Sequence, residues 1–147
     1  MTLSYKPFYS DLAIVIPAYN EEKTLENVIR ESKQFGFVIV VDDYSSDNTA
    51  KIAEEMLVDC ISNHKNLGYD KALLIGIQRA IDNKFKYVIT IDGDGELPVS
   101  RIPDIYKKFN SKCDLVIGIR DKKNRFFESV FSIISKWYCG IEDPLCG

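Results

Sequence analysis

The chain alternates short, almost uninterrupted apolar runs with longer segments of helical periodicity. Four runs rich in Val, Ile and Leu have the length of a strand, and a shorter run is a further candidate. The four are Leu12 to Pro17, Phe37 to Asp42, Tyr87 to Asp92 and Asp114 to Ile119, and the shorter one is Val58 to Ile61. Because nearly every position in these runs is apolar, they predict strands that are buried on both faces of a sheet.

The segments between the runs have the spacing of amphipathic helices. Glu22 to Phe35 places apolar residues on one face, and Gly36 behind it is a common helix stop. Asp70 to Asn83 carries an apolar stripe that is expected to face the core, formed by Leu73, Leu74, Ile77, Ala80 and Ile81. The other expected helices are Asn48 to Leu57, Ser100 to Asn110 and Phe126 to Cys139. Ser46 and Asp47, which precede the first of these, are its capping candidates. Strands that alternate with helices predict the α/β class, with a parallel, doubly wound sheet.

Length and composition fit a single soluble domain over residues 1–147. Apolar residues make up 46% and charged residues 28% of the chain, and no apolar run reaches membrane-spanning length. The net charge of −3 argues against nucleic acid as the main partner. The cysteines form no Cys-x-x-Cys pair and no signal peptide precedes them, which predicts reduced thiols in a cytoplasmic protein. They are Cys60, Cys113, Cys139 and Cys146. His64 is the only histidine, so a zinc site would need unusual ligands.

Acidic residues collect where three of the expected strands end. The first strand runs into PAYNEE (17–22), the second into DDYSSD (42–47) and a later one into DGDGE (92–96). Right-handed crossovers place the carboxyl ends of parallel strands at one edge of the sheet, which is where such sheets bind ligands. Clustered carboxylates repel one another unless a cation or hydrogen-bond donors compensate them. The sequence therefore predicts a hard divalent cation, Mg²⁺ or Mn²⁺, at this edge.

Asp92, Asp94 and Glu96 are the candidate ligands of this cation. They alternate along the chain, so in an extended segment their side chains would share a face, with glycines between them that allow a close approach. A metal held there would bridge the acids and a diphosphate and neutralise the charge of a leaving group. A solvated Asp-Gly turn is the alternative interpretation of this segment. In the pair Asp42-Asp43, one acid is expected to accept hydrogen bonds from a base or a ribose.

Other motifs with acidic or glycine-rich signatures are missing. An EF-hand loop that began at Asp92 would need Gly at position 97 and Glu at position 103, where the chain has Leu97 and Pro103. Neither the G-x-G-x-x-G dinucleotide fingerprint nor the P-loop pattern occurs in the chain.

Six segments in series form a longer pattern that covers nearly the whole chain. They are IVIPAYNEEKTL (14–25), VIVVDDYSSDNTAKIA (38–53), NLGYDKALLIGI (66–77), VITIDGDGELP (88–98), LVIGIR (115–120) and DPLCG (143–147). In this order they resemble family 2 glycosyltransferases of the GT-A fold, and within these the polyprenyl-phosphate branch that is similar to dolichol-phosphate-mannose synthase. The resemblance implies a Rossmann-like fold with a mostly parallel central sheet flanked by helices. It also implies a chain that is cut short at its C-terminus, because catalytic domains of the family continue past the DPLCG motif.

The resemblance implies a nucleotide-binding role for several residues. Pro17, Tyr19 and Glu21 match the loop that cradles the nucleotide. Asp43 matches the acid that contacts the base, and Lys71 lies in the segment that helps to hold the nucleotide. A surface charge on its helix is the alternative for Lys71.

The resemblance also implies which residues handle the metal and the diphosphate. Asp92 and Asp94 match the DxD motif of the family, with Asp94 as the main metal ligand. Glu96 stands where the polyprenyl-phosphate branch often has Gln and is expected to reach the metal. Arg120 matches an arginine suited to a diphosphate or an acceptor phosphate, and Asp143 could position an acceptor or act as a base.

The implied reaction is the inverting transfer of a sugar from a nucleoside diphosphate sugar to a lipid-phosphate or glycan acceptor, in cell-envelope or glycan biosynthesis. A hydroxyl acceptor needs a general base, whereas a polyprenyl phosphate is already ionised near neutral pH. The apolar helix expected at Phe126 to Cys139 follows a basic stretch, so it could lie on the inner face of a membrane. A core helix, or one covered by further chain, is the alternative. Left exposed, this helix could form a homodimer.

Three other functions stay open at this stage. A signalling receiver domain shares the parallel sheet and an acidic pair, but in receivers the pair ends the first strand and here it ends the second. A sugar-phosphate nucleotidyltransferase would open with a Gly- and Arg-rich phosphate loop, which PAYNEE is not. A catalytically impaired remnant that still binds a nucleotide sugar would fit a shortened chain.

Overall fold

In the computed structural model, which describes residues 6–109, four parallel strands form one sheet. The strands are β1 (Leu12–Ala18), β2 (Phe37–Asp42), β3 (Asp59–Ser62) and β4 (Tyr87–Thr90), and their order in space is β3-β2-β1-β4. Each neighbouring pair is parallel, with Ala18 of β1 opposite Asp42 of β2 and Asp42 opposite Ser62 of β3. The predicted α/β class and parallel sheet are confirmed.

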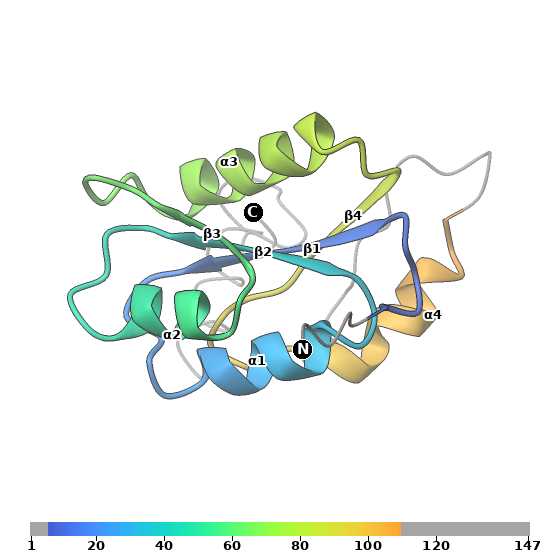
Figure 1. The fold of residues 1–147 in the computed structure, drawn as a ribbon, viewed down its shortest axis with the longest axis horizontal. Coiled ribbons are helices and arrows are strands. Elements are labelled where there is room, and N and C mark those ends of the chain that lie inside the picture. Colours follow the sequence, from blue (N-terminus) through green and yellow to red (C-terminus); the bar gives the residue numbers. More distant parts are fainter. Residues whose placement is uncertain (1–5, 110–147) are drawn as a thin grey trace, which may run out of the picture. The chain divides into compact units, whose positions relative to one another are not determined.

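Helices cover both faces of this sheet (Figure 1). They are α1 (Leu25–Ser32), α2 (Thr49–Glu55), α3 (Tyr69–Asp82), the short 3₁₀ helix η1 (Val99–Arg101) and α4 (Ile102–Tyr106). Figure 1 shows α3 on one face and α1, α2 and α4 on the other. Helices α1 and α2 are shorter than predicted, because turns replace their first or last residues. Helix α3 has the predicted length but begins and ends one residue earlier, and the segment expected as one helix from Ser100 is divided into η1 and α4.

The remaining expected elements, a strand at 114–119 and a helix at 126–139, lie outside the described residues. The described residues belong to one compact unit of the chain, residues 1–114. A single domain that continues to residue 147 stays a prediction. Across residues 6–109, the helices are all too short or too polar to span a bilayer.

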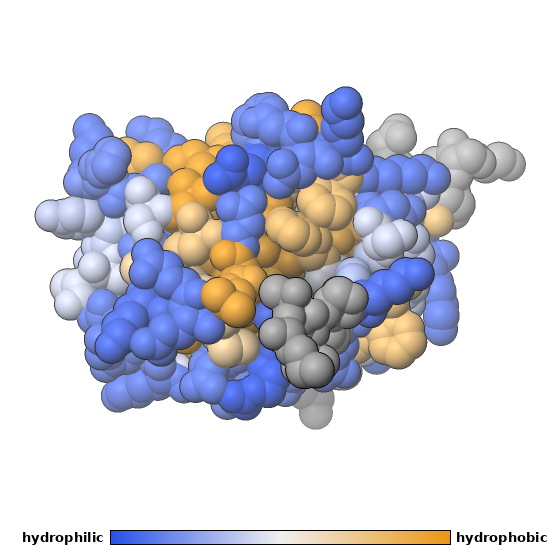
Figure 2. Space-filling view, in the orientation of Figure 1, coloured by the Kyte–Doolittle hydropathy of each residue, from blue (hydrophilic) through white to orange (hydrophobic). Residues whose placement is uncertain are grey.

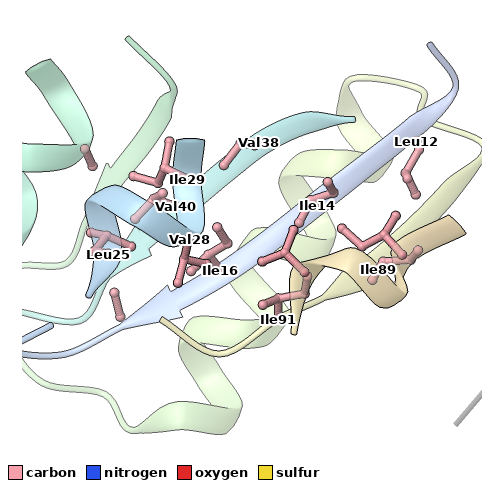
Figure 3. Packing of buried hydrophobic residues seen from close by; sticks show 14 residues of the cluster. Leu12, Ile14, Ile16, Leu25, Val28, Ile29, Val38, Val40, Ile89 and Ile91 are labelled. Carbon is pink, nitrogen blue, oxygen red and sulfur yellow. The ribbon is translucent and has the colours of Figure 1, made fainter. Parts of the chain in front are cut away.

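Strand β1 is buried along its whole length and contributes to two separate hydrophobic layers. Leu12, Ile14 and Ile16 pack on the side of α1, whereas Ala13 and Val15 pack on the side of α3. Figure 3 shows the first of these layers, in which apolar side chains of α1 meet those of β1 and β2. This alternation follows from the two-residue period of a strand, and it explains why the run has no polar position.

Helix α3 contacts the sheet mainly through small residues, so the predicted apolar stripe is confirmed at Ala80 and Leu73 and is wrong at Leu74 and Ile81. Its buried residues are Ala72, Gly76 and Ala80, whereas Leu74 is 63% and Ile81 57% exposed. A Cβ atom at Gly76 would lie 2.3 Å from Cγ1 of Val15 and 3.1 Å from Cγ2 of Val41. The helix therefore lies too close to the strands for large side chains, and the face with small residues packs inward. In the view of Figure 2, hydrophobic residues gather between the two more hydrophilic helical layers.

Candidate functional site

The carboxyl ends of the parallel strands bring four loops to one edge of the sheet. These loops are residues 19–24 after β1, 43–48 after β2, 63–68 between β3 and α3, and 91–98 after β4. Backbone hydrogen bonds continue the sheet into them, because the N–H of Asp43 donates to Ala18 O at 2.9 Å and the N–H of Asn63 donates to Asp42 O at 2.9 Å. The edge predicted to collect the acidic residues is therefore present.

The loop after β1 is joined to the loop after β2 by side chains from both. The backbone N–H of Asn20 donates to Ser45 Oγ at 2.9 Å, and Asn20 Oδ1 accepts from the N–H of Ser46 at 2.8 Å. Glu22 Oε2 accepts from the backbone N–H of Asn48 at 3.2 Å and from its side-chain amide at 2.9 Å. These contacts give the PAYNEE loop a defined position above the second strand.

Asp47 and Thr49 hold the backbone of the same loop. Thr49 Oγ1 accepts from the N–H of Glu21 at 2.8 Å, and Asp47 Oδ2 accepts from the N–H of Glu22 at 3.1 Å. Asp47 Oδ1 accepts from both the hydroxyl and the N–H of Thr49, the latter at 2.9 Å. Burial alone would raise the pKa of Asp47, but these hydrogen bonds outweigh it and lower the pKa.

The predicted capping roles need a correction at this point. Helix α2 starts at Thr49 after Asn48, one residue later than expected. Ser46 donates its N–H to Asn20 and does not cap the helix, while Asp47 reaches the N–H of Thr49 but also binds the neighbouring loop. Polar residues near a helix start serve whichever backbone donors lie within reach, and here a second loop supplies some of them.

Asp43 is buried, with 3% of its surface exposed, and it organises the β3–α3 loop. Its Oδ1 accepts from the side-chain amide of Asn63 at 2.8 Å and from the N–H of Leu67 at 2.9 Å, and its Oδ2 accepts from the N–H of Gly68 at 2.7 Å. Burial by itself would raise the pKa of Asp43, but the donors Leu67, Asn63 and Gly68 together lower it. The charge of Asp43 is therefore stabilised by the protein. Its predicted contact with a base stays a prediction.

The other acid of the pair, Asp42, is also 3% exposed but has far fewer partners. The N–H of Ser45 lies 3.4 Å from its Oδ2, and its Oδ1 has no hydrogen-bond partner among the described residues.

Asp92 and Asp94, which follow β4, lie near Glu21 of the loop after β1. The hydroxyl of Thr24 donates to Gly93 O at 2.8 Å and lies 3.2 Å from Glu21 Oε2, which ties the two loops together. Burial raises the pKa of Glu21, the negative charges of Asp94, Asp47 and Asp92 raise it further, and the hydrogen bond from Thr24 lowers it in part. Glu21 therefore lies close enough to Asp92 and Asp94 for their negative charges to act on its carboxylate.

Asp92 has a partner that the sequence did not predict. The hydroxyl of Tyr69, at the start of α3, donates to Asp92 Oδ1 at 2.8 Å. Burial and this hydrogen bond to a carboxylate raise the pKa of Tyr69 well above its usual range, so the phenol stays a neutral donor.

The segment after β4 forms a turn, which corrects the expected extended backbone. Asp94 Oδ1 accepts from the N–H of Glu96 at 2.8 Å, and Gly95 has a φ of 75°. Such a side-chain-closed turn with a left-handed glycine is common Asp-Gly chemistry. Asp92 and Asp94 are half-buried and Glu96 is exposed, so these three side chains do not share a face through strand geometry.

Asp92 and Asp94 could hold a divalent cation only together with a bound ligand. Within residues 6–109, no three acidic, cysteine or histidine side chains form a ready metal site. Mg²⁺, however, is usually bound by one or two carboxylates together with substrate phosphates, rather than by an all-protein cage. Asp92 and Asp94 each use Oδ1 for a protein donor, and their Oδ2 atoms accept no hydrogen bond from the described residues.

The positions of the other predicted site residues indicate less about how a ligand would bind. Pro17 is buried in β1, Tyr19 is 50% exposed directly after it, and Lys71 is exposed in the first turn of α3. Arg120 and Asp143 lie outside the described residues. Cys60 is a free cysteine, and the other three cysteines lie outside the described part of the chain, so the prediction of reduced thiols stays a prediction.

Sequence reasoning placed Asp47 at this edge but missed that Asp47 and Thr49 hold the loop after β1, and it missed Tyr69 altogether. The polar run SSDNT (45–49) was a usable signal for the first two, because it holds more side-chain acceptors than one helix start needs. Nothing in the order of residues indicates that Tyr69 meets Asp92, since they come from different elements and lie 23 positions apart.

Comparison with known proteins places this sequence in a family. Residues 13–135 match the family described as Glycosyl transferase family 2. An uncharacterised protein of Methanocaldococcus jannaschii is 37% identical over 90% of this chain and 68% of its own length. The UDP-N-acetylglucosamine–dolichyl-phosphate N-acetylglucosaminyltransferase of Methanococcus voltae is 28% identical over 80% of this chain and 55% of its own.

A further relative and a solved structure are also similar. The undecaprenyl-phosphate 4-deoxy-4-formamido-L-arabinose transferase of Proteus mirabilis is 35% identical over 78% of this chain and 37% of its own. The crystal structure of glucosyl-3-phosphoglycerate synthase from Mycobacterium tuberculosis, in complex with UDP, has a TM-score of 0.45 and 27% identity over 56% of this chain and 33% of that one. The chain thus spans between 37% and 68% of the lengths of the three curated relatives.

Proposed function

The chain belongs to glycosyl transferase family 2, and from this membership we propose that it binds a nucleoside diphosphate sugar at the carboxyl edge of its sheet and transfers the sugar, with inversion, to a lipid-phosphate acceptor. The observation that carries the proposal is that acids from two strand ends lie together: Thr24 contacts both Glu21, after β1, and the carbonyl of Gly93, which lies between Asp92 and Asp94 after β4. Such a cluster is costly unless a cation or a ligand with donors compensates it.

The nucleotide would lie between the loops after β1 and β2 and the β3–α3 loop. Tyr19 is half-exposed at the start of the first of these loops. Asp43 orders the third loop through Leu67 and Gly68, and it is the residue we propose to face the base. Lys71, exposed one turn into α3, is within the same region of the chain and supplies a positive charge for a phosphate.

The diphosphate end of the donor would lie beside Asp92 and Asp94, which would hold Mg²⁺ or Mn²⁺ through carboxylate oxygens. When bound, such an ion supplies neutralisation of the charge that develops on the departing diphosphate. Asp94 uses one oxygen to close its own turn on the N–H of Glu96, so the carboxylate presents its other oxygen from a defined backbone position. Glu96 would contribute a carboxylate oxygen to the same ion.

A lipid phosphate as acceptor is supported by the names of two relatives, which act on dolichyl phosphate and undecaprenyl phosphate. A phosphate is ionised near neutral pH and attacks without a general base. Arg120 would hold a phosphate and Asp143 would position the acceptor, both on the strength of the sequence pattern alone. Such an acceptor would bring the chain to the cytoplasmic face of a membrane.

Donor binding can be tested directly by calorimetry. UDP, GDP and their sugar conjugates are titrated in the presence of Mn²⁺ or Mg²⁺ and again in EDTA. We expect binding of one nucleotide class that requires metal and that weakens at least about tenfold in Asp94→Asn, because this change removes the charge but keeps an acceptor for the N–H of Glu96. Asp104→Asn is the matched control, since Asp104 forms an exposed ion pair with Arg101 at 3.4 Å and belongs to α4, outside the acidic loops.

Transfer is tested separately, by incubation of the metal-bound protein with the bound nucleotide's sugar conjugate and a polyprenyl phosphate. A sugar-lipid product would support the whole proposal. Donor binding without product would restrict the function to nucleotide-sugar binding. Absence of binding by every nucleotide would refute the assignment of this edge as a donor site.

A further inference from the structure

Tyr69 occupies a position where it can control one of the proposed metal ligands. Its hydroxyl donates to Asp92 Oδ1 at 2.8 Å, and among the described residues no other group donates a hydrogen bond to the Asp92 side chain. Tyr69 is 49% exposed and belongs to neither hydrophobic cluster, so its side chain contributes little to core packing. The hydrogen bond is therefore the main structural contribution of the hydroxyl.

The backbone that carries Tyr69 is held from the other side by Asp43. Asp43 accepts from the N–H groups of Leu67 and Gly68 at 2.9 and 2.7 Å, and Tyr69 is the next residue. Gly68 has a φ of 89°, a conformation that other residues rarely adopt, and it turns the chain into α3. A continuous chain of contacts thus runs from Asp43 through residues 67–69 to Asp92.

This chain of contacts bears on the geometry of the acidic cluster. Asp92 and Asp94 are both negative and lie near Glu21, so repulsion favours rotation of the Asp92 carboxylate away from its neighbours. A donor fixed on Oδ1 opposes that rotation and leaves Oδ2 available. Partners that orient metal-binding carboxylates in this way contribute about 10- to 100-fold to metal affinity.

We propose that Tyr69 is a positioning residue for Asp92: its hydroxyl holds the carboxylate in the orientation that binds a divalent cation, and the Asp43-anchored loop sets the position of Tyr69. The inference rests on the proposed function, because it assumes a cation at Asp92 and Asp94. The proposal gives a role to a residue outside the acidic motif. It also connects Asp43, which we propose to face the base, with Asp92, which we propose to bind the metal.

The test compares Tyr69→Phe with Tyr106→Phe. The first change removes the hydroxyl and keeps the ring. The second removes an equivalent bond elsewhere, since the hydroxyl of Tyr106 donates to Asp11 Oδ1 at 2.7 Å, and Asp11 precedes β1 at the opposite edge of the sheet. Mn²⁺ is titrated into each protein and followed by water proton relaxation, alone and with UDP or GDP. Thermal unfolding without metal shows that each variant is folded.

We expect Mn²⁺ to bind about 10- to 100-fold more weakly to Tyr69→Phe than to the unchanged protein, and equally well to Tyr106→Phe. Nucleotide affinity should recover in Tyr69→Phe when Mn²⁺ is raised to saturation, which a general loss of structure would not produce. Equal Mn²⁺ affinity in Tyr69→Phe would overturn this inference and leave the proposed function intact. If the unchanged protein bound no Mn²⁺ with either nucleotide, both would be overturned.

Discussion

Asp43 carries a negative charge where water barely reaches, and the surrounding protein compensates it. Its donors are the amide of Asn63 and the backbone N–H groups of Leu67 and Gly68. Hydrogen bonds from backbone N–H groups to a buried carboxylate are among the stronger ones in proteins, and each unsatisfied donor left behind is costly. At the scale of one residue, this acid therefore serves the fold as well as the proposed site.

The variant Asp43→Asn tests whether the Asp43 carboxylate stabilises the fold. At neutral pH we expect the free energy of unfolding to fall by about 1–3 kcal/mol, because an amide replaces a charged acceptor. The pKa of Asp43 is lower in the folded than in the unfolded chain. Its contribution is therefore present above the unfolded value, about 3.9, and is lost as the pH falls through the folded value.

Urea unfolding of both proteins at a series of pH values measures the effect. The difference between unchanged protein and variant should stay constant from neutral pH to about pH 5 and narrow only in more acidic buffer. Asp104→Asn, at an exposed ion pair, should differ from the unchanged protein by less than about 1 kcal/mol. A difference for Asp43→Asn that grew with acidity would contradict the assignment.

At the scale of elements, the approach of α3 to the sheet decides what lies where. The helix meets β1 and β2 through Ala72, Gly76 and Ala80, and its large apolar residues Leu74 and Ile81 are exposed. Tyr69 is the first residue of this helix, and its hydroxyl contacts Asp92. The distance between helix and sheet therefore bears on where the Tyr69 hydroxyl lies relative to Asp92.

The variant Gly76→Ala tests how closely α3 must pack against the sheet. The added Cβ would lie 2.3 Å from Cγ1 of Val15, so the helix or the strand must shift. We expect a loss of about 1–3 kcal/mol in the free energy of unfolding from overpacking, even though alanine is the better helix former. Gln78→Ala, at an exposed position of the same helix, should cost little. Urea denaturation compares them, and a Gly76→Ala variant as stable as the unchanged protein would show that the helix can move away freely.

At the scale of the whole molecule, the proposed site exists only because loops from separate strand ends meet. Asp47 and Thr49 hold the loop after β1, and Thr24 ties that loop to Gly93 after β4. A ligand that bridges these loops binds the folded chain and not the unfolded one, so it stabilises the fold by mass action.

Metal and nucleotide together should therefore raise the midpoint of thermal unfolding. At a nucleotide concentration 100 times its Kd the gain is about 2.7 kcal/mol, which corresponds to several degrees for a chain of this size. Differential scanning fluorimetry with Mn²⁺, with nucleotide, and with both would measure it. An equal shift from nucleotide in EDTA would argue against a cation between the acids and the diphosphate.

The sequence by itself determined the α/β class, the order of the elements and the edge of the sheet where the acidic residues gather. Strand and helix periods are local properties, and parallel strands necessarily share a carboxyl edge, so Asp43, Asp92 and Asp94 could be placed there from their positions alone. The family resemblance carried by the six segments was confirmed over residues 13–135.

Only the tertiary structure decided which face of α3 packs inward, how the acidic segment after β4 turns, and which donors meet which carboxylates. Helical periodicity gives the angle of Leu74 or Gly76 about the axis but not the distance between helix and sheet, and that distance selected the small residues. The contacts of Tyr69 with Asp92 and of Asp47 with Glu22 join loops far apart in the chain. They depend on how packed elements position the loop backbones, which no local pattern contains.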